Sequence, residues 1–281
     1  MILLIFLLFS LYSFEEPCSS EEDVVKTDTL LWQQEDTGLE IEELPENHSS
    51  AGIDVIISEK TKVMSIPLSY RFSKRVSVEI GIPYVRKKFE RWDGTEYINS
   101  GIGDISLLGR YELGEEERLK NIFSFIFKFP TGDEGKGIGT GSFDFGLFLV
   151  GIKRVGVYRF FVNTGYRVNG VDKDDSLETD YGDVFTFLIG GEYFFKEDLR
   201  PFVKFRFVNN FESKRSSLGY TWGLWDDVKI GDIIVGLRLK LFNLIGFSLG
   251  IEIPVFTEYN ENISSPEERK PVMSIKGYKT L

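Results

Sequence analysis

The feature that most constrains this sequence is an alternation of apolar and polar residues over runs of about ten positions. In residues 245–255, every odd position is apolar and every even position is glycine, serine, glutamate or proline. Successive side chains of a strand point to opposite faces, so each run predicts a strand with one apolar and one polar face. Such runs occupy 51–58, 63–72, 76–84, 104–113, 122–129, 143–153, 158–168, 184–195, 201–209, 230–241, 245–255 and 270–281.

The connections between these runs alternate in length. Short connections fall at 73–74, 114–118, 154–156, 196–198 and 242–243. Long connections fall at 87–101, 131–141, 169–182, 210–228 and 258–269. Transmembrane barrels of the outer-membrane type have strands of about ten residues, short periplasmic turns and longer external loops. The alternation in connection length therefore favours this class.

Two kinds of fold use many alternating strands. A soluble sandwich or barrel turns its apolar faces inward, whereas a membrane barrel turns them towards lipid and keeps polar residues inside. Tyr and Phe are abundant, at 12 and 25 residues, and several lie near the ends of the apolar faces, as in an interfacial girdle. We therefore predict an all-β fold, a transmembrane antiparallel up-and-down β-barrel of about 12 strands over residues 51–281, in the lipid of the cell outer membrane.

The chain begins with an uncharged apolar run, residues 1–14, followed by Glu15 and Glu16. The run is too short for a membrane-spanning helix, and its length matches the apolar core of a secretory signal peptide. We expect a signal peptide over residues 1–13, with cleavage after Ser13. Residues 14–50 then form an acidic periplasmic leader, which is either a mobile tail or a plug of the barrel.

The distribution of charge along the chain and the scarcity of His and Cys exclude several functions. Residues 14–47 account for the whole formal net charge of −11, with twelve acids and one base, so no basic surface indicates a nucleic-acid partner. One His and one Cys exclude a zinc site built from these residues and an intrachain disulfide, and we expect no cofactor. His48 precedes the first predicted strand, so the barrel lacks the usual general base and we expect no enzyme activity.

Two glycine-containing motifs adjoin predicted strands: Gly-Ile-Gly-Asp at 101–104 and Pro-Thr-Gly-Asp at 130–133. Pro130 has no backbone donor and tends to end strand pairing. Gly132 permits a turn with positive φ, which the side chain of Thr131 or Asp133 can cap. These four residues either shape the mouth of a loop or contact a ligand directly.

Further motifs follow, Gly-Thr-Gly-Ser-Phe-Asp at 139–144 and Asn-Thr-Gly-Tyr-Arg at 163–167. In this order the motifs resemble those of the MetA-pathway of phenol degradation family of outer-membrane proteins, over roughly residues 65–255. The resemblance implies an outer-membrane barrel that passes small, often aromatic, compounds. The acidic leader is not part of the matching pattern.

Charged residues on the polar faces are predicted to point into the lumen. The candidate solute-binding residues are Arg110, Lys128, Asp144, Arg159, Arg167, Glu192, Lys204, Arg206, Arg238 and Lys240. Such charges either pair and hold the wall or a plug in place, or line a wet path that sets ion and solute preference. The last four lie on the successive runs 201–209 and 230–241, where they would form a basic wall that favours anions.

The sequence thus predicts an outer-membrane channel for passive uptake or efflux of small solutes, aromatic or hydrophobic ones included. The alternative is a closed structural barrel without transport activity. The two hypotheses differ in whether the pore is open.

Overall fold

The computed structural model describes residues 48–90, 94–116, 119–174, 177–180, 182–196, 198–211, 213–217, 220–225, 227–241, 245–259 and 269–280. The predicted signal peptide at 1–13 and residues 14–47 of the predicted leader lie outside these ranges. The barrel begins at Ser49, so the last two residues assigned to the leader belong to its first strand. Within the described ranges, no helix has the length and apolarity needed to cross a membrane.

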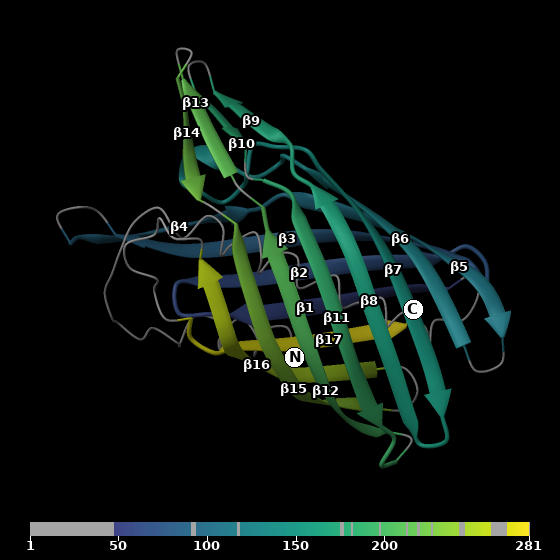
Figure 1. The fold of residues 1–281 in the computed structure, drawn as a ribbon. Helices are drawn as coiled ribbons and strands as arrows, with labels where there is room; N and C mark the ends of the chain where they lie inside the picture. Colours follow the sequence, from purple (N-terminus) through teal and green to yellow (C-terminus); the bar gives the residue numbers. More distant parts are fainter. Residues whose placement is uncertain are drawn as a thin grey trace.

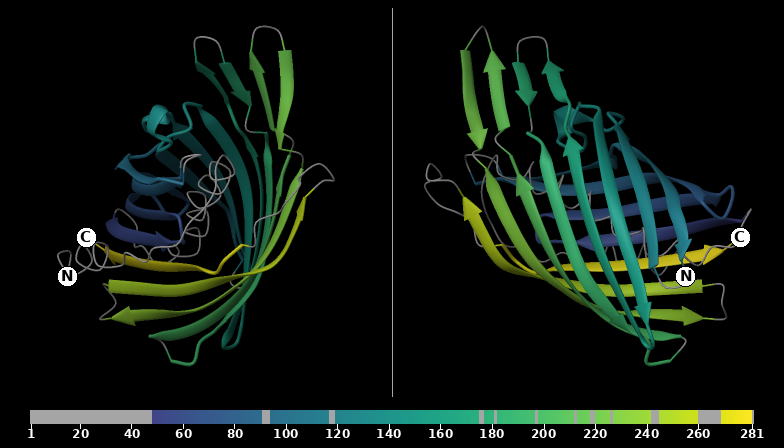
Figure 2. Two further views of the ribbon diagram at one scale, coloured as in Figure 1. Left: turned by 90° about the vertical axis from the view of Figure 1, so that its left-hand side faces the viewer. Right: turned by 45° about the vertical axis from the view of Figure 1, so that its right-hand side comes forward.

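Twelve antiparallel strands close into an up-and-down barrel, which confirms the predicted fold (Figures 1 and 2). These strands are β1 (Ser49–Ile57), β2 (Thr61–Arg71), β3 (Val76–Glu90), β5 (Ile105–Glu116), β6 (Leu119–Phe129), β7 (Asp144–Val155), β8 (Tyr158–Val168), β11 (Val184–Tyr193), β12 (Leu199–Asn210), β15 (Val228–Leu241), β16 (Ile245–Tyr259) and β17 (Val272–Thr280). Each pairs with its neighbours along the chain, and β1 pairs with β17 to close the ring. Every predicted run corresponds to one of these strands.

Both ends of the barrel sequence lie at the same rim, because Ser50 pairs with Thr280. The short connections that follow β2, β5, β7, β11 and β15 lie at this rim as well. In outer-membrane barrels the short turns mark the periplasmic side. We therefore call this rim the periplasmic end, and the opposite rim, with the long connections, the outer end.

The long connections contain strands that the sequence analysis treated as loops. β4 (Glu96–Ile102) continues β5 outward beyond a break at Gly103 and Asp104, and it pairs with the outer part of β3. A separate four-stranded sheet extends past the outer end (Figure 2); its strands are β9 (Val171–Asp174), β10 (Leu177–Asp180), β13 (Ser213–Ser217) and β14 (Tyr220–Trp225). Segments such as Val-Asp-Lys-Asp and Ser-Lys-Arg-Ser-Ser have no apolar face, so alternation did not reveal them.

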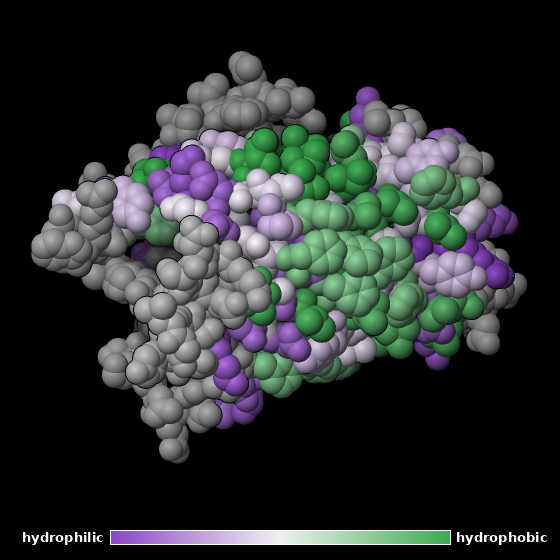
Figure 3. Space-filling model, turned by 90° about the horizontal axis from the view of Figure 1, so that it is seen from above, coloured by the Kyte–Doolittle hydropathy of each residue, from purple (hydrophilic) through white to green (hydrophobic). Residues whose placement is uncertain are grey.

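The barrel is apolar outside and polar inside. On β3, Ile80 is 42% exposed and its neighbour Glu79 only 5%; on β16, Ile251 is 45% exposed and Glu252 only 5%. Figure 3 shows hydrophobic side chains gathered across the middle of the wall, with hydrophilic ones towards both ends. This pattern is the reverse of a soluble barrel and matches a wall surrounded by lipid.

One sector of the inner face is apolar, which the sequence analysis did not anticipate. Two buried clusters form it; they comprise Ile122, Val150, Ile152, Phe161 and Leu188, and Leu108, Ile126 and Phe148. Several of the strands involved, such as β6 and β7, carry bulky apolar residues on both faces. The lumen is therefore lined by both polar and apolar surface.

Candidate functional site

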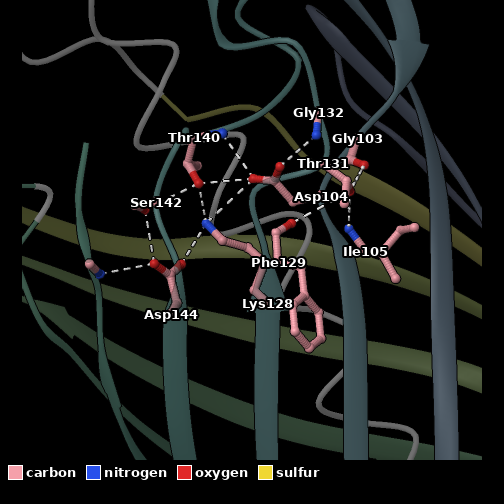
Figure 4. A network of polar contacts seen from close by, with 11 residues as sticks. Gly103, Asp104, Ile105, Lys128, Phe129, Thr131, Gly132, Thr140, Ser142 and Asp144 are labelled. Carbon is pink, nitrogen blue, oxygen red and sulfur yellow. Dashed lines mark hydrogen bonds and ion pairs between the residues drawn. The ribbon is translucent and has the colours of Figure 1, made fainter. Parts of the chain in front are cut away.

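The outer end of the lumen contains a buried polar network, here called the mouth network (Asp104, Lys128, Thr140, Ser142 and Asp144; Figure 4). Asp104 lies at the break between β4 and β5 and is 3% exposed. Its Oδ1 accepts a hydrogen bond from the Gly132 N–H at 2.9 Å. Its Oδ2 accepts from the backbone N–H and the hydroxyl of Thr140, at 2.8 and 2.9 Å. The interrupted strand thus fixes two points of the loop at 130–143, between β6 and β7.

Lys128 supplies the positive charge of the mouth network. Its Nζ lies 2.5 Å from Asp144 Oδ2 and 3.6 Å from Asp104 Oδ2. It also donates a hydrogen bond to the hydroxyl oxygen of Thr140. Asp144 Oδ1 accepts from the Ser142 hydroxyl and from the Gly170 N–H, each at 3.0 Å. Lys128 is 3% exposed and Asp144 is 0% exposed. Both were predicted to contact solute, and the structure places them beneath the loop that they hold.

The start of the loop bridges the break in the wall. The Thr131 hydroxyl donates to the Gly103 carbonyl at 3.0 Å and accepts from the Ile105 N–H at 2.9 Å. Pro130 follows the last residue of β6 directly, where strand pairing ends. A Cβ at Gly103 would lie 3.0 Å from a methyl group of Val85, so a side chain there would be crowded. These contacts support the loop-shaping interpretation of the motif.

Asp133, the last residue of the motif, caps the short 3₁₀ helix η3 (Glu134–Lys136). Its Oδ1 accepts from the Lys136 N–H at 3.1 Å, and its Oδ2 lies 2.7 Å from Lys136 Nζ. This side-chain hydrogen bond lowers the pKa of the Asp133 carboxyl below its ordinary value. The carboxylate is therefore engaged within its own loop.

The middle of the loop at 130–143 packs against the far side of the mouth. Ile138 is 2% exposed and belongs to a cluster with inward-facing residues of β1, β2, β3 and β17, namely Ile56, Val63, Val85 and Val272. Asn99 of β4 donates to the Lys136 carbonyl at 2.7 Å. Gly137 has φ of +64°, and a Cβ there would lie 2.7 Å from the Phe89 ring. The loop at 130–143 thus narrows the outer mouth.

Much of the predicted basic wall is ion-paired. Arg206 Nη2 lies 2.8 Å from Asp232 Oδ2 and 2.5 Å from Glu252 Oε1. Arg269, in the connection before β17, contacts the same two carboxylates at 2.6 and 3.3 Å. Two cations and two anions therefore balance each other on this side of the lumen. The sequence analysis missed Arg269 because it lies in a long connection without alternation.

Nearer the periplasmic end, other predicted residues meet around Glu192 of β11. Glu192 accepts a hydrogen bond from Arg159 Nε at 2.8 Å and another from Arg238. Lys204 Nζ lies 4.8 Å from the centroid of the Phe202 ring. Lys240 lies on the same inner face of β15 as Arg238, two residues nearer the rim. Because Arg206 and Arg238 bind carboxylates, the four bases do not form one uniform cationic wall.

The opposite wall carries its own ion pairs. Arg110 Nη1 lies 3.5 Å from Glu79, and Arg71 Nη2 lies 2.7 Å from Glu112. Arg167, which is 5% exposed, faces inward on the outer half of β8. The structure thus places every candidate lumen residue on the inner face of the barrel. Contact of these residues with a solute stays a prediction.

No family model and no curated protein matches the chain, so the motif resemblance to the MetA-pathway family has no such match to support it. Among solved structures, the chain is similar to the crystal structure of the COG4313 outer membrane channel from Pseudomonas putida F1. The identity is 11% and the TM-score 0.66, over 85% of this chain and 97% of that chain. The chain is also similar to the NanC porin, at 6% identity and a TM-score of 0.50, over 82% of this chain and 98% of that chain.

At these identities the likeness concerns the fold. The shared feature with the first structure is a closed antiparallel barrel of the outer-membrane type. The apolar outer face, which reverses the soluble pattern, independently requires a lipid environment. The chain is therefore an outer-membrane β-barrel.

Proposed function

We propose that the protein is a passive outer-membrane channel for small solutes. The observation that carries this proposal is the charged interior, in which arginines, lysines, aspartates and glutamates occupy inward positions around the closed barrel. Removing an ionised group from water costs on the order of several kcal/mol, and apolar side chains can fill a barrel of purely structural role. A charged lining is instead typical of a wet path that selects ions and solutes.

The proposed solutes are small and include aromatic and hydrophobic compounds. The motif resemblance implies this class. The inner face is not wholly polar, since apolar side chains such as Ile152, Phe161 and Leu188 point inward and pack against one another. Diffusion needs no cofactor and no catalytic group, and we propose no enzyme activity. His48, the only His of the chain, lies at the periplasmic rim, where its carbonyl accepts from the Arg71 N–H at 3.0 Å.

A closed structural barrel is the second candidate. The loop at 130–143 favours it, because Ile138 packs against the far wall and the mouth network anchors the loop. For the segments ahead of the barrel, we propose export by a signal peptide at 1–13 and a leader at 14–48 that is a tail or a plug. The leader has twelve acids and one base, which suits contact with inward-facing cations.

Single-channel recording of the refolded protein in planar bilayers distinguishes the two candidates. Steady conductance supports the channel. If protein that migrates as a folded barrel shows no conductance, the channel proposal is overturned and the structural barrel is left. Deletion of residues 15–47, which spares β1, tests the leader. A plug predicts higher conductance after deletion, and a tail predicts no change.

A further inference from the structure

The outward face of the barrel carries a row of polar residues at the outer ends of β2 and β3 and on β4, here called the outer row: Lys62, Arg86 and Ser100. Lys62 pairs with Arg86 between β2 and β3, and Arg86 pairs with Ser100 between β3 and β4. Arg86 points outward, because its neighbours Val85 and Lys87 are buried on the inner face, at 0% and 1% exposed. Residues directly opposite each other share a face, so the three side chains lie side by side on the outer surface.

An apolar tier lies next to the outer row, towards the middle of the wall. Met64, Tyr84 and Ile102 occupy the same three strands two residues nearer the middle, and they pair in the same register. Tyr84 is 39% exposed and Ile102 is 58% exposed. Tyrosine is enriched at the level where a membrane meets water, because its ring is apolar and its hydroxyl is polar. The outer row therefore begins where the apolar surface of the wall ends.

The distance along β3 places the outer row at the edge of the membrane. Every outward residue of β3 from Val76, at the periplasmic end, to Tyr84 is apolar or aromatic, and Arg86 follows. From Val76 to Arg86 the strand extends about 34 Å, and a tilt of about 40° reduces this to about 26 Å along the membrane normal. The apolar band of an outer-membrane barrel is about 25 Å tall. The outer row therefore lies at the level of the lipid headgroups in the outer leaflet.

The outer row brings two positive charges together. Lys62 and Arg86 stand directly opposite each other, and like charges in this arrangement destabilise a strand pair. Two residues further outward on β3, Lys88 is matched with an acid, since its Nζ lies 2.6 Å from Glu96 Oε1. Among the residues that the structure describes, no carboxylate forms an ion pair with Arg86. An anion bound beside Arg86 would therefore relieve the repulsion.

The side chains of the outer row suit a phosphate group. Arg86 is half-buried and Ser100 is exposed, so both are accessible from the lipid. Long basic side chains lay their aliphatic stem along apolar surface and extend the charged end to the headgroup level. A guanidinium group binds a phosphate through two charge-assisted hydrogen bonds, and a serine hydroxyl can donate a third. The ammonium group of Lys62 adds positive potential at the same place, whatever else it contacts.

We propose that the outer row binds the phosphate group of an anionic lipid in the outer leaflet. The phosphate contacts Arg86 and Ser100, and an acyl chain of the same lipid lies along Tyr84 and Ile102. This inference goes beyond the proposed channel function and does not depend on whether the pore is open. A free phosphate ion meets the same charges and gains nothing from the apolar tier.

Native mass spectrometry of the full-length protein in detergent tests the proposal by counting bound lipids. The probes are phosphatidic acid, whose headgroup is a phosphate monoester, and phosphatidylcholine with the same acyl chains, whose headgroup is neutral overall. We expect phosphatidic acid to bind about tenfold more tightly. Arg86→Gln should weaken its binding about fivefold, and the Lys62→Gln, Arg86→Gln double variant about tenfold or more. Binding of phosphatidylcholine should not change in either variant.

Lys229→Gln is the matched control. Lys229 also faces outward at the outer end, on β15, but its Nζ lies 3.4 Å from Glu258 Oε1. The substitution removes the same charge as Arg86→Gln and should leave the binding of phosphatidic acid unchanged. Inorganic phosphate at the concentration of the lipid should displace none of it.

Equal binding of the two lipids, an unchanged affinity in Arg86→Gln, or an equal loss in Lys229→Gln overturns the proposal. Displacement of phosphatidic acid by an equal concentration of inorganic phosphate also overturns it, because the site would then select the free anion. If the double variant does not fold, the Arg86→Gln single variant decides alone. If that variant does not fold either, Arg86→Lys replaces it; this variant keeps the charge, loses the paired hydrogen bonds and should weaken binding about threefold.

Discussion

The two ends of the lumen use charge in opposite ways. In the mouth network one lysine is shared by two aspartates, and no member is more than 5% exposed. At the periplasmic end, three guanidinium groups, those of Arg154, Arg159 and Arg200, lie over the ring of Phe194. One carboxylate there, that of Glu192, accepts hydrogen bonds from Arg159 and Arg238. At the outer end, buried groups that bind each other hold a loop in place. At the periplasmic end, an aromatic ring and one carboxylate hold several guanidinium groups close together. The two ends of the interior therefore keep their charged groups in place by different contacts.

The largest loss of stability is expected from Lys128→Met in the mouth network. The carboxylates of Asp104 and Asp144 would remain buried without the ammonium group between them, and breaking a buried pair costs about 3–5 kcal/mol. Urea-induced unfolding monitored by tryptophan fluorescence measures the change. Lys136→Met, which removes an exposed ion pair of the same loop, is the control and should show no measurable loss. Similar losses in both variants would contradict a structural role of the buried network.

A smaller loss of stability, with a clear change of function, is expected from Glu192→Gln at the other end. The substitution replaces the charged acceptor of Arg159 and Arg238 by a neutral one, which costs about 1–3 kcal/mol. It also removes one negative charge beside Arg159 and Arg238. The reversal potential in a potassium chloride gradient should therefore shift towards stronger anion preference. An unchanged reversal potential would show that this end does not set the selectivity.

Gly137→Ala tests whether the loop narrows the mouth. The residue has a left-handed backbone with φ of +64°, and the new Cβ would lie 2.7 Å from the Phe89 ring. We expect a loss of about 1 kcal/mol and a higher single-channel conductance, because the loop is displaced from the wall. Gly135→Ala is the matched control, since its Cβ would make an ordinary contact 3.5 Å from Asp133. Lower conductance in Gly137→Ala would place the constriction elsewhere.

The wall of the barrel was predictable because lipid selects an apolar residue at every second position of each strand. That selection revealed the twelve strands and the inward direction of residues such as Lys128 and Asp144. It could not reveal β9 or β13, which lie beyond the barrel wall and have no apolar face. The sequence therefore predicts the barrel wall best, because the surrounding lipid constrains the residues of the wall most strongly.

The sites were only partly predictable. Lys128 was predicted to face the lumen, but Thr140 joins it from a loop, where no periodicity relates residues in space. Arg154 and Arg200 lie one residue outside the predicted runs 143–153 and 201–209, whereas β7 and β12 extend past both. Strand boundaries are the least certain part of a sequence-based prediction, and both arginines lie at such boundaries.

The smallest expected effect comes from Asp133→Asn, which removes the ion pair with Lys136 and keeps an oxygen that can cap η3. The bond with Lys136 lowers the folded-state pKa of Asp133 below its ordinary value of 3.8. The wild-type loop therefore has this contribution in full above pH 3.8 and loses it as the pH falls through the lower folded-state value. We expect the current noise of the wild type to rise over that range and the noise of Asp133→Asn to stay constant. Equal pH dependence in both proteins would show that the ion pair between Asp133 and Lys136 does not steady the loop.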